Sequence, residues 1–437
     1  MRIAVVGLGH TGLVAAAVLA DRGHTVNGHD IESEKRRLIQ GGTCPFLEPG
    51  LDELVASGLA SGRLRVVDTI DECLRDAEVV VLAVGTPVAN GDGPNLAEFW
   101  SAAGQVVPVM PKTAVLAIKC TLPVGTTDEL IRRFSSTWIR ESPVVSVPEF
   151  LRQGSAVKDF LQPDRVVLGS HSRMAIDTMR RVYEPFGIPA DRFVECTPAE
   201  AELIKHATNS FLATKISFAN ELANLCGRMG LNYEVIRRGL ALDPRVGGQF
   251  LHAGLGFGGS CFPKDVAALI QTAREAQCPL TLLAAALDAN RRQIKHVADL
   301  AREMLDELEG KRVFQLGLTY KAGTDDLRGS LAVELAFLLA RGGAEVTCYD
   351  PGYKPGKVGS DRMFRLVEDP VAAAQGIDLI LIATDWPQFR DLPWDKIAKL
   401  MRSPHLLDGR NLLDPQMLSK AGFIYRGIGR PQKSDEA

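Results

Sequence analysis

Residues 3–12 read "IAVVGLGHTG", and this stretch decides the fold of the first half of the chain. A short β-branched run leads into Gly7, Gly9 and Gly12, which occupy the G-x-G-x-x-G positions. An alanine-rich helix is predicted over residues 13–22, and a second strand, "HTVNGHD", ends at Asp30. In such a strand–helix–strand unit the glycines allow a tight turn, close approach of a pyrophosphate and close helix packing. The unit therefore predicts a dinucleotide site with the phosphates at the helix N-terminus.

Asp30 bears on which dinucleotide is bound. It follows the last glycine by 18 residues, close to the spacing of about 20 at which an acid meets the adenosine ribose. A carboxylate accepts hydrogen bonds from the ribose diol and repels a 2′-phosphate, so NAD is favoured over NADP. Arginines of the following "KRR" (residues 35–37) offer the alternative of holding that phosphate. We interpret Arg36 and Arg37 as a solvated helix face.

Further strands follow the same parallel pattern. Apolar runs at 77–87 and 113–121 end in polar residues, which is typical of buried parallel strands. Ligands in such sheets lie beyond the carboxyl ends of the strands, so Thr86 and Thr121 are candidate cofactor contacts, although a threonine there is often only a turn residue.

The C-terminal part repeats this scheme with runs at 311–320, 342–350, 377–386 and 405–411, but it has no G-x-G-x-x-G after its first strand. We predict an α/β chain of two doubly wound, Rossmann-like parallel-sheet domains. The second domain should hold its nucleotide differently from the first.

The middle of the chain is predicted to be helical. Apolar residues recur at helical spacing from about 198 to Gly230, which predicts one long helix between the two sheet domains. We therefore divide the chain into an NAD-binding domain at 1–197, a central helical domain at 198–300 and a C-terminal domain at 301–437. The long helix is either a homodimer interface or packed within its own subunit.

Composition narrows the class of protein. A formal net charge of −3 gives no sign of the basic surface that nucleic-acid binding needs. No run of basic residues suggests binding to a membrane surface. The eight cysteines stand singly, without a C-x-x-C pair, which argues against zinc and disulfides and favours a reducing cytoplasm. The apolar run at 13–20 is too short to span a bilayer. We expect a cytoplasmic protein without a metal site.

Residues 258–265, "GGSCFPKD", place Cys261 between a glycine run and a predicted helix that starts near Pro263. A helix N-terminus and a neighbouring ammonium, here Lys264, favour a thiolate. The alternative is a small buried residue in a tight turn.

Lys205 and Asn209 are four residues apart on the long helix, so they share a face and could stabilise the oxygen of an alcohol under oxidation. Asp265 and Glu149 are candidates for proton transfer. NAD, a thiolate and such a pair together favour a four-electron oxidation of an alcohol to an acid through a thiohemiacetal and a thioester. A two-electron hydroxy-acid dehydrogenase and a non-enzymatic nucleotide-binding protein are the alternatives.

The motifs resemble those of the UDP-glucose/GDP-mannose dehydrogenase family from residue 1 to about 430. The resemblance is carried by "GLGHTG", "VGTP" (84–87), "KCTLPVGTT" (119–127), "PEFLRQGSAVKDF" (148–160), "PDRVVLG" (163–169), the stretch 201–221, "FLHAGLGFGGSCFPKD" (250–265) and "KAGTDDLR" (321–328). It implies NAD as cofactor and a nucleotide sugar as substrate. UDP-glucose is favoured, and GDP-mannose or a UDP-N-acetylhexosamine is the alternative.

The resemblance also implies residue roles. The thioester would form on Cys261, and protons, water and the oxyanion would be handled by Asp265, Lys205, Asn209, Thr121 and Glu149. The cofactor would be held by Gly7, Gly9, Thr11, Gly12, Asp30, Lys35, Thr86, Thr121, Glu149, Lys264 and Arg328. The nucleotide sugar would be held by Glu149, Phe150, Leu151, Arg152, Lys205, Asn209, Phe250, Leu251, His252, Ala253, Gly254, Gly258 and Lys321.

Some positions depart from the family's usual residues. The family commonly has Asn at Val147, Ser at Cys120, Glu at Gly329 and Tyr-Val at His10-Thr11. None of these departures removes a proposed catalytic group.

Overall fold

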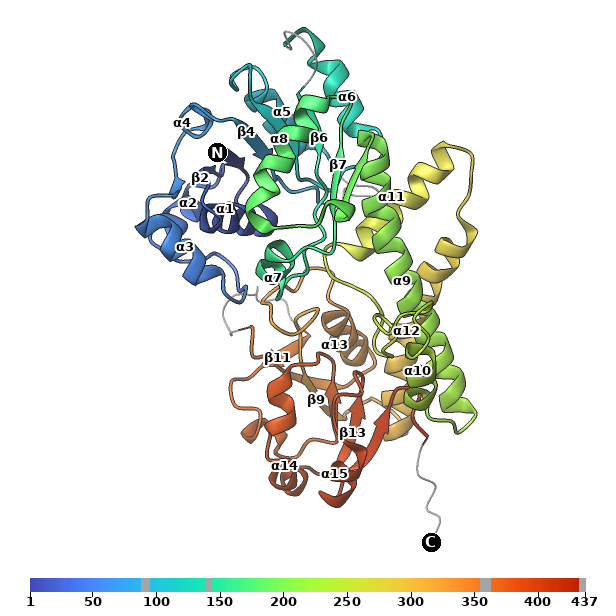
Figure 1. Ribbon diagram of the computed structural model, residues 1–437. Helices are drawn as coiled ribbons and strands as arrows, with labels where there is room; N and C mark the ends of the chain where they lie inside the picture. The colour runs from blue at the N-terminus through green and yellow to red at the C-terminus, as the bar shows by residue number, and fades with distance from the viewer. Residues whose placement is uncertain (88–94, 138–142, 354–362, 432–437) are drawn as a thin grey trace. The chain divides into compact units, whose positions relative to one another are not determined.

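The computed structural model describes residues 1–87, 95–137, 143–353 and 363–431. The chain divides into two compact units. The first consists of Met1–Thr208 and Ala267–Cys278, and the second of Asn209–Val266 and Pro279–Ala437. Each unit is built on one sheet of mostly parallel strands, as Figure 1 shows.

The sheet of the first unit has eight strands in the order β3-β2-β1-β4-β5-β6-β7-β8. Neighbours pair in parallel except β6 and β7, which meet antiparallel at Ser146 and Gly169. The strand order reverses at β1, because β2 and β3 follow on one side of it and β4 and β5 on the other. Ligands of doubly wound sheets bind at such a reversal. The strands are β1 (Arg2–Val6), β2 (Thr25–His29), β3 (Leu64–Val66), β4 (Val79–Leu82), β5 (Val115–Ile118), β6 (Val144–Ser146), β7 (Val166–Gly169) and β8 (Phe193–Cys196).

Alternating side chains of these strands enter two separate cores, because successive residues of a strand point to opposite faces. Ile3 and Val5 of β1 belong to one core, and Ala4 and Val6 belong to the other. Both faces are therefore apolar, which explains the unbroken hydrophobic runs in the sequence. The covering helices are α1 (His10–Asp21), α2 (Ser33–Gln40), α3 (Leu51–Ala60), α4 (Ile70–Leu74), α5 (Ala97–Val106), α6 (Thr126–Arg133), α7 (Ala156–Leu161) and α8 (Arg173–Tyr183).

Two helices belong to both units, because the chain passes from one to the other within them. They are α9 (Pro198–Arg228) and α11 (Phe262–Glu275). The prediction of one long helix from about 198 is confirmed, and it ends two residues before Gly230.

The sheet of the second unit is fully parallel, in the order β11-β10-β9-β12-β13-β14, which repeats the order of the first six strands of the first unit. Helices α9, α12 and α13 contribute to the core on one face, and the other face carries a core that includes Phe314, Trp386 and Trp394. The elements are α10 (Tyr233–Ala241), α12 (Thr281–Leu305), β9 (Arg312–Leu316), α13 (Leu331–Arg341), β10 (Glu345–Tyr349), β11 (Phe364–Leu366), β12 (Leu379–Ile382), α14 (Trp394–Leu400), β13 (His405–Asp408), α15 (Pro415–Lys420) and β14 (Ile424–Gly427).

The predicted fold class, two doubly wound Rossmann-like sheets and a long central helix, is confirmed. The division at 1–197, 198–300 and 301–437 stays a proposal, since the helical residues 198–300 are shared between the two compact units. Among the described residues, no helix combines the length and the apolar character that crossing a membrane requires.

Candidate active site

The glycine-rich turn after β1 is shaped by close backbone contacts. Gly7 has a φ of +92°, and a Cβ there would lie 2.7 Å from the carbonyl oxygen of Ala83. A Cβ on Gly12 would lie 1.8 Å from the carbonyl oxygen of Gly7. A Cβ on Gly9, by contrast, would meet nothing within 4 Å, so a ligand can approach the backbone there. Helix α1 begins at the next residue, His10, and the turn thus suits the phosphates of a dinucleotide.

Asp30 lies at the carboxyl end of β2, as predicted, and is 5% exposed. Its Oδ2 accepts hydrogen bonds from the backbone N–H of Leu8 at 2.7 Å and from Lys35 Nζ at 3.1 Å. Its Oδ1 accepts one from the backbone N–H of Glu32 at 3.0 Å. Burial opposes the charge on Lys35, but its contacts with Glu32 and Asp30 outweigh burial and raise its pKa. The structure thus brings the two predicted ribose contacts together.

The prediction of a solvated face is wrong for Arg36. Its side chain is only 12% exposed, and it donates to Asp68 at 3.2 Å and to the carbonyl oxygen of Asp30 at 2.6 Å. The guanidinium holds the turn that follows β2, because unpaired backbone carbonyls there need a donor. Arg37 is exposed, as predicted.

Thr86 and Thr121, which follow β4 and β5, lie beside one another. The hydroxyl of Thr86 donates to the carbonyl oxygen of Thr121 at 3.0 Å. The two strands are neighbours in the sheet, so their carboxyl ends meet at the same edge as the glycine-rich turn.

Glu149 and Lys205 form a nearly buried ion pair. Glu149 follows β6, and its Oε1 lies 3.0 Å from Lys205 Nζ on α9, with side chains 10% and 5% exposed. The other carboxylate oxygen accepts the backbone N–H of Leu151 at 2.6 Å. An ion pair held this way in a low-dielectric setting is suited to moving or stabilising a proton. Glu149 is therefore not an exposed loop residue.

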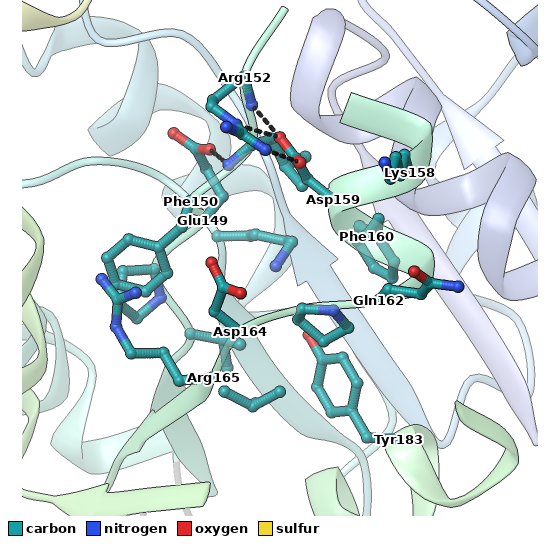
Figure 2. A pocket seen from close by; sticks show the side chains of 16 residues that line it. Glu149, Phe150, Arg152, Lys158, Asp159, Phe160, Gln162, Asp164, Arg165 and Tyr183 are labelled. Carbon is teal, nitrogen blue, oxygen red and sulfur yellow. Dashed lines mark hydrogen bonds and ion pairs between the residues drawn. The ribbon is translucent and has the colours of Figure 1, made fainter. Parts of the chain in front are cut away.

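A pocket of about 260 Å³ opens beside this pair and includes the predicted sugar contacts Phe150, Leu151 and Arg152 in its wall. Figure 2 shows Arg152 facing Asp159 at one end of the pocket and Arg165 against the ring of Phe150. The Arg152 guanidinium donates to both oxygens of Asp159, at 2.6 and 3.0 Å. Although burial opposes it, this contact lowers the pKa of Asp159.

Three cationic residues that line this pocket, Lys119, Lys158 and Arg165, are not among the site residues predicted from the sequence. The guanidinium of Arg165 lies 3.8 Å from the centre of the Phe150 ring, and its Nη2 donates to Thr208 at 3.2 Å. Lys119 is 8% exposed and is the last residue of the apolar run "AVLAIK". Its ammonium lies 5.1 Å from the centre of the Phe160 ring. A charged residue at the end of an apolar run was the signal that could have identified Lys119.

In the second unit, Cys261 directly precedes α11, and its carbonyl oxygen accepts the backbone N–H of Asp265 at 2.9 Å. The predicted position at a helix N-terminus is confirmed, with Phe262 rather than Pro263 as the first helical residue. Cys261 is exposed, whereas burial raises the pKa of Cys73 to about 12 and that of Cys196 to about 11. Cys278 is the other exposed cysteine. The alternative of a buried structural cysteine is therefore wrong for Cys261.

Asp265 links the groups around Cys261. It is 1% exposed, and its Oδ2 accepts a hydrogen bond from Asn209 Nδ2 at 2.5 Å while its Oδ1 lies 2.8 Å from Lys264 Nζ. Lys264 and Asp265 are both in the first turn of α11, and Asn209 comes from α9. The structure thus joins the three predicted residues Asn209, Lys264 and Asp265, although Asn209 and Asp265 are 56 positions apart in the chain.

Arg328 carries its charge near the cysteine. Its guanidinium is fixed by Asp326 through contacts of 2.7 to 3.1 Å, which raise its pKa, and it also interacts electrostatically with Cys261. A cation at this place favours the thiolate form of cysteine.

The predicted sugar loop, residues 250–254, is anchored by residues that sequence reasoning missed. The carbonyl oxygen of Leu251 accepts the Tyr233 hydroxyl at 2.8 Å. The backbone of Gly254 binds Asn220 and Gln293, each at 2.8 Å. Leu251, Ala253 and Gly254 are buried, whereas His252 is exposed. Lys321 is half-buried, with its ammonium 5.6 Å from the ring of Tyr320.

The acid that ends the second strand of the C-terminal repeat, Asp350, binds the turn after β9 as Asp30 binds Leu8 in the turn after β1. Asp350 accepts the backbone N–H groups of Leu318 and Thr319 at 2.6 and 2.8 Å, and the Thr319 hydroxyl at 2.9 Å. This carboxylate closes the turn after β9 with its own chain.

Within the described ranges, no group of three His, Cys, Asp or Glu side chains could hold a metal ion.

Comparison with known proteins covers nearly the whole chain. Three family profiles match: "UDP-glucose/GDP-mannose dehydrogenase family, NAD binding domain" at residues 1–187, the central domain at 199–292 and the UDP binding domain at 315–415. The glycine-rich turn and Asp30 fit the NAD that the first profile names.

Individual relatives agree with these profiles. UDP-glucose 6-dehydrogenases of Rhizobium meliloti (strain 1021) and Pseudomonas aeruginosa are each 40% identical, over 99% of this chain and 100% and 98% of those proteins. The solved structure of a UDP-glucose dehydrogenase from Pyrobaculum islandicum superposes with a TM-score of 0.89 at 35% identity, covering 98% of both chains. A UDP-D-ManNAc dehydrogenase from Pyrococcus horikoshii gives 0.88 at 32% identity, covering 99% of this chain and all of that one.

Proposed function

The chain belongs to the UDP-glucose/GDP-mannose dehydrogenase family, and we propose that it oxidises the C6 alcohol of UDP-glucose to the carboxylate of UDP-glucuronate. The exposed Cys261 at the start of α11, beside the Asn209–Asp265–Lys264 cluster, is the observation that carries the proposal. The choice of UDP-glucose rests on the relatives that bear its name at about 40% identity.

Bound NAD supplies the hydride acceptor for two successive oxidations. In the first, the C6 hydroxyl loses its proton to the Glu149–Lys205 pair as C6 loses hydride, and an aldehyde results. Lys205 and Asn209 stabilise the negative oxygen while the proton leaves. The hydrogen bond from Leu151 holds Glu149 in place for this transfer.

Cys261 makes the second oxidation possible. Its thiolate attacks the aldehyde carbon, a C–S bond forms, and the oxyanion takes a proton to give a thiohemiacetal. Loss of that proton and of hydride to a second NAD gives a thioester. A water whose proton passes to Asp265 then attacks the thioester, the C–S bond breaks, and the thiolate leaves the carboxylic acid. In sum, one sugar nucleotide alcohol, two NAD⁺ and one water give one carboxylate, two NADH and three protons.

The stoichiometry of NADH tests this mechanism. With UDP-glucose limiting, wild type should yield two NADH per sugar. Cys261→Ala should abolish the second oxidation, and Cys261→Ser should stop after the first oxidation or as a stable ester. Cys278→Ala, at the other exposed cysteine, is the control and should behave as wild type. A single NADH per sugar, with Cys261→Ala as active as wild type, contradicts the proposal and favours a two-electron dehydrogenase.

A panel of sugars tests the substrate. We expect UDP-glucose to have a higher kcat/KM than UDP-galactose, UDP-N-acetylglucosamine, UDP-N-acetylmannosamine and GDP-mannose. The similarity to a UDP-D-ManNAc dehydrogenase at 32% identity makes the acetylated sugar the main alternative. Preference for it would change the substrate assignment and leave the thioester chemistry in place. Tight NAD binding without turnover of any of these sugars would favour the non-enzymatic interpretation.

We also propose that the enzyme works in the cytoplasm as a homodimer or larger homo-oligomer. All eight cysteines are free of disulfide bonds, which suits a reducing compartment.

A further inference from the structure

We propose that His10 and Glu48 couple the dinucleotide turn to the loop that carries Glu149, and so act as positioning residues for both ligands. The proposal rests on the proposed function, because it takes NAD at the N-terminus of α1 and the nucleotide sugar at residues 149–152. Nothing in the chemistry assigned above uses either His10 or Glu48.

Glu48 is a buried carboxylate with three donors from two parts of the first unit. Its side chain is fully inaccessible. Its Oε2 lies 2.7 Å from His10 Nε2 and accepts the backbone N–H of Gly154, also at 2.7 Å. Its Oε1 accepts the backbone N–H of Ala156 at 2.8 Å. A buried charge is tolerated only when it is satisfied in this way, so the carboxylate holds all three groups in one arrangement.

His10 is the first residue of α1 and directly follows Gly9, the glycine whose surroundings are open. Its ring packs on Phe46, with centroids 5.1 Å apart, and is 19% exposed. Because both carboxylate oxygens of Glu48 already accept backbone N–H groups, Nε2 of His10 is the donor in the third contact. The first turn of α1, where the pyrophosphate would bind, is thereby tied to Glu48.

The other two donors lead to the sugar loop. Gly154 and Ala156 flank the N-cap of α7, Ser155, and the N–H groups at the start of a helix otherwise have no partner. Glu149 lies six residues before Ser155. The loop between Glu149 and Ser155 is rigid, since Arg152 and Ser155 both bind Asp159 of α7. A shift of α7 would therefore move the loop that places Glu149 and Phe150.

His10 is also a position where this chain differs from its family, which commonly has tyrosine. A tyrosine hydroxyl can donate to a carboxylate as the imidazole N–H does, whereas phenylalanine fills the same space against Phe46 without a donor. The expected consequence is specific. Removal of the donor should weaken the influence of one ligand on the other more than it weakens either ligand bound alone.

The coupling can be measured with a pair that does not react, NAD and UDP-glucuronate, because C6 of the latter is already a carboxylate. Calorimetry gives the Kd of UDP-glucuronate without NAD and at saturating NAD. For wild type we expect NAD to lower the Kd of UDP-glucuronate by about 5-fold or more, which is the lower end of the usual range for coupled sites. For His10→Phe the factor should fall to about 1, and for His10→Tyr it should return toward the wild-type value.

The matched control is His171→Phe. His171 also contacts a carboxylate of the first unit, Asp128 at 2.8 Å, but the pair is exposed and lies outside the site. This variant should keep the wild-type factor. His10→Asn, whose side chain is too short to span the distance to Glu48, serves as a second loss variant should His10→Phe fail to fold, and the same fall is expected.

Wild-type coupling retained in His10→Phe or His10→Asn overturns the proposal, as does independent binding of the two ligands to wild type. If wild type binds neither NAD nor UDP-glucuronate, the proposed function itself is wrong, and this inference falls with it. The proposal is supported if both loss variants lower the coupling factor and His10→Tyr restores it. A merely structural role would instead weaken the binding of each ligand equally, whether or not the other ligand is present.

Discussion

At the residue scale, Gly329 explains one departure of this chain from its family. Its φ is +60°, and a Cβ there would lie 2.6 Å from the carbonyl oxygen of Gly259. Its own carbonyl oxygen accepts the backbone N–H of Gly259 at 2.9 Å and would lie 2.5 Å from a Cβ on Gly258. The segment that precedes Cys261 thus touches the backbone beside Arg328, and only glycine leaves room for this contact.

We predict that Gly329→Ala lowers the free energy of unfolding by about 1–3 kcal/mol, because a side chain is strained in the left-handed region and would collide with Gly259. It should also lower kcat, since the segment leading to Cys261 must move. Denaturant unfolding and steady-state kinetics measure the two effects. Gly104→Ala, inside α5 with nothing within 4 Å, is the control and should be neutral or stabilise by about 0.5–1 kcal/mol. Equal stability of Gly329→Ala and wild type would contradict this account.

At the scale of elements, the start of α9 holds the loop between β5 and α6. Glu202 accepts the backbone N–H of Gly125 at 2.6 Å, the backbone N–H of Thr127 at 2.8 Å and the Thr127 hydroxyl at 2.6 Å. It thereby caps the N-terminus of α6. His206, one turn further along α9, binds the carbonyl oxygen of Leu122 at 2.8 Å. The helix that carries Lys205 and the loop that carries Thr121 are therefore one rigid assembly.

Burial raises the pKa of Glu202 to about 7 and outweighs the three hydrogen bonds, which favour the carboxylate. Its ordinary pKa is 4.5, so between these values the folded protein holds the proton more tightly than the unfolded chain. Stability should therefore fall as pH rises from about 4.5 to 7 and change no further above that. Relative to Glu202→Gln, wild type should lose up to about 3 kcal/mol between pH 5 and pH 8.

Denaturant unfolding of both proteins at the two pH values checks this prediction. Glu129→Gln, on the exposed side of α6 next to Arg133, should leave the pH dependence as it is in wild type. A stability difference between wild type and Glu202→Gln that stays constant with pH would rule the titration out.

At the scale of the whole molecule, one face of α9 is left apolar and open. Phe211, Phe218 and Leu225 follow one another at intervals of seven residues and are 66%, 52% and 51% exposed. Residues seven apart lie on one side of a helix, so the three form an apolar stripe along that side. Monomeric soluble proteins seldom expose such a surface, and a second copy of the chain can cover it symmetrically. The stripe supports the homodimer interface of the sequence analysis over packing within the subunit.

Phe218→Glu should therefore convert the proposed dimer to a monomer, because a carboxylate at the centre of the stripe would be buried without a partner. Light scattering after size exclusion should give about twice 47.3 kDa for wild type and about 47.3 kDa for the variant. Val109→Glu, at an apolar residue that is 53% exposed in the first unit, should stay dimeric. A wild-type monomer, or a dimeric Phe218→Glu, would place the interface elsewhere or remove it.

The sequence by itself determined the architecture and the set of chemical groups. Unbroken apolar runs, glycines at fixed spacing and a helical period over 30 residues are local patterns that follow from burial and backbone geometry. The same holds for Cys261 before a helix and for Lys205 and Asn209 one turn apart, since each depends only on neighbouring residues.

Only the tertiary structure decided which residues contact one another. The pairs Glu149–Lys205 and Asn209–Asp265, the capping of α6 by Glu202, and the contacts of Glu48 with His10 and α7 join residues 38 to 108 positions apart. A carboxylate in a loop has no local signature of its partner, because the partner is set by which chain segments pack together. Arg36 was misjudged for the same reason: its charge favoured solvent, and the fold supplied Asp68 and a backbone carbonyl instead.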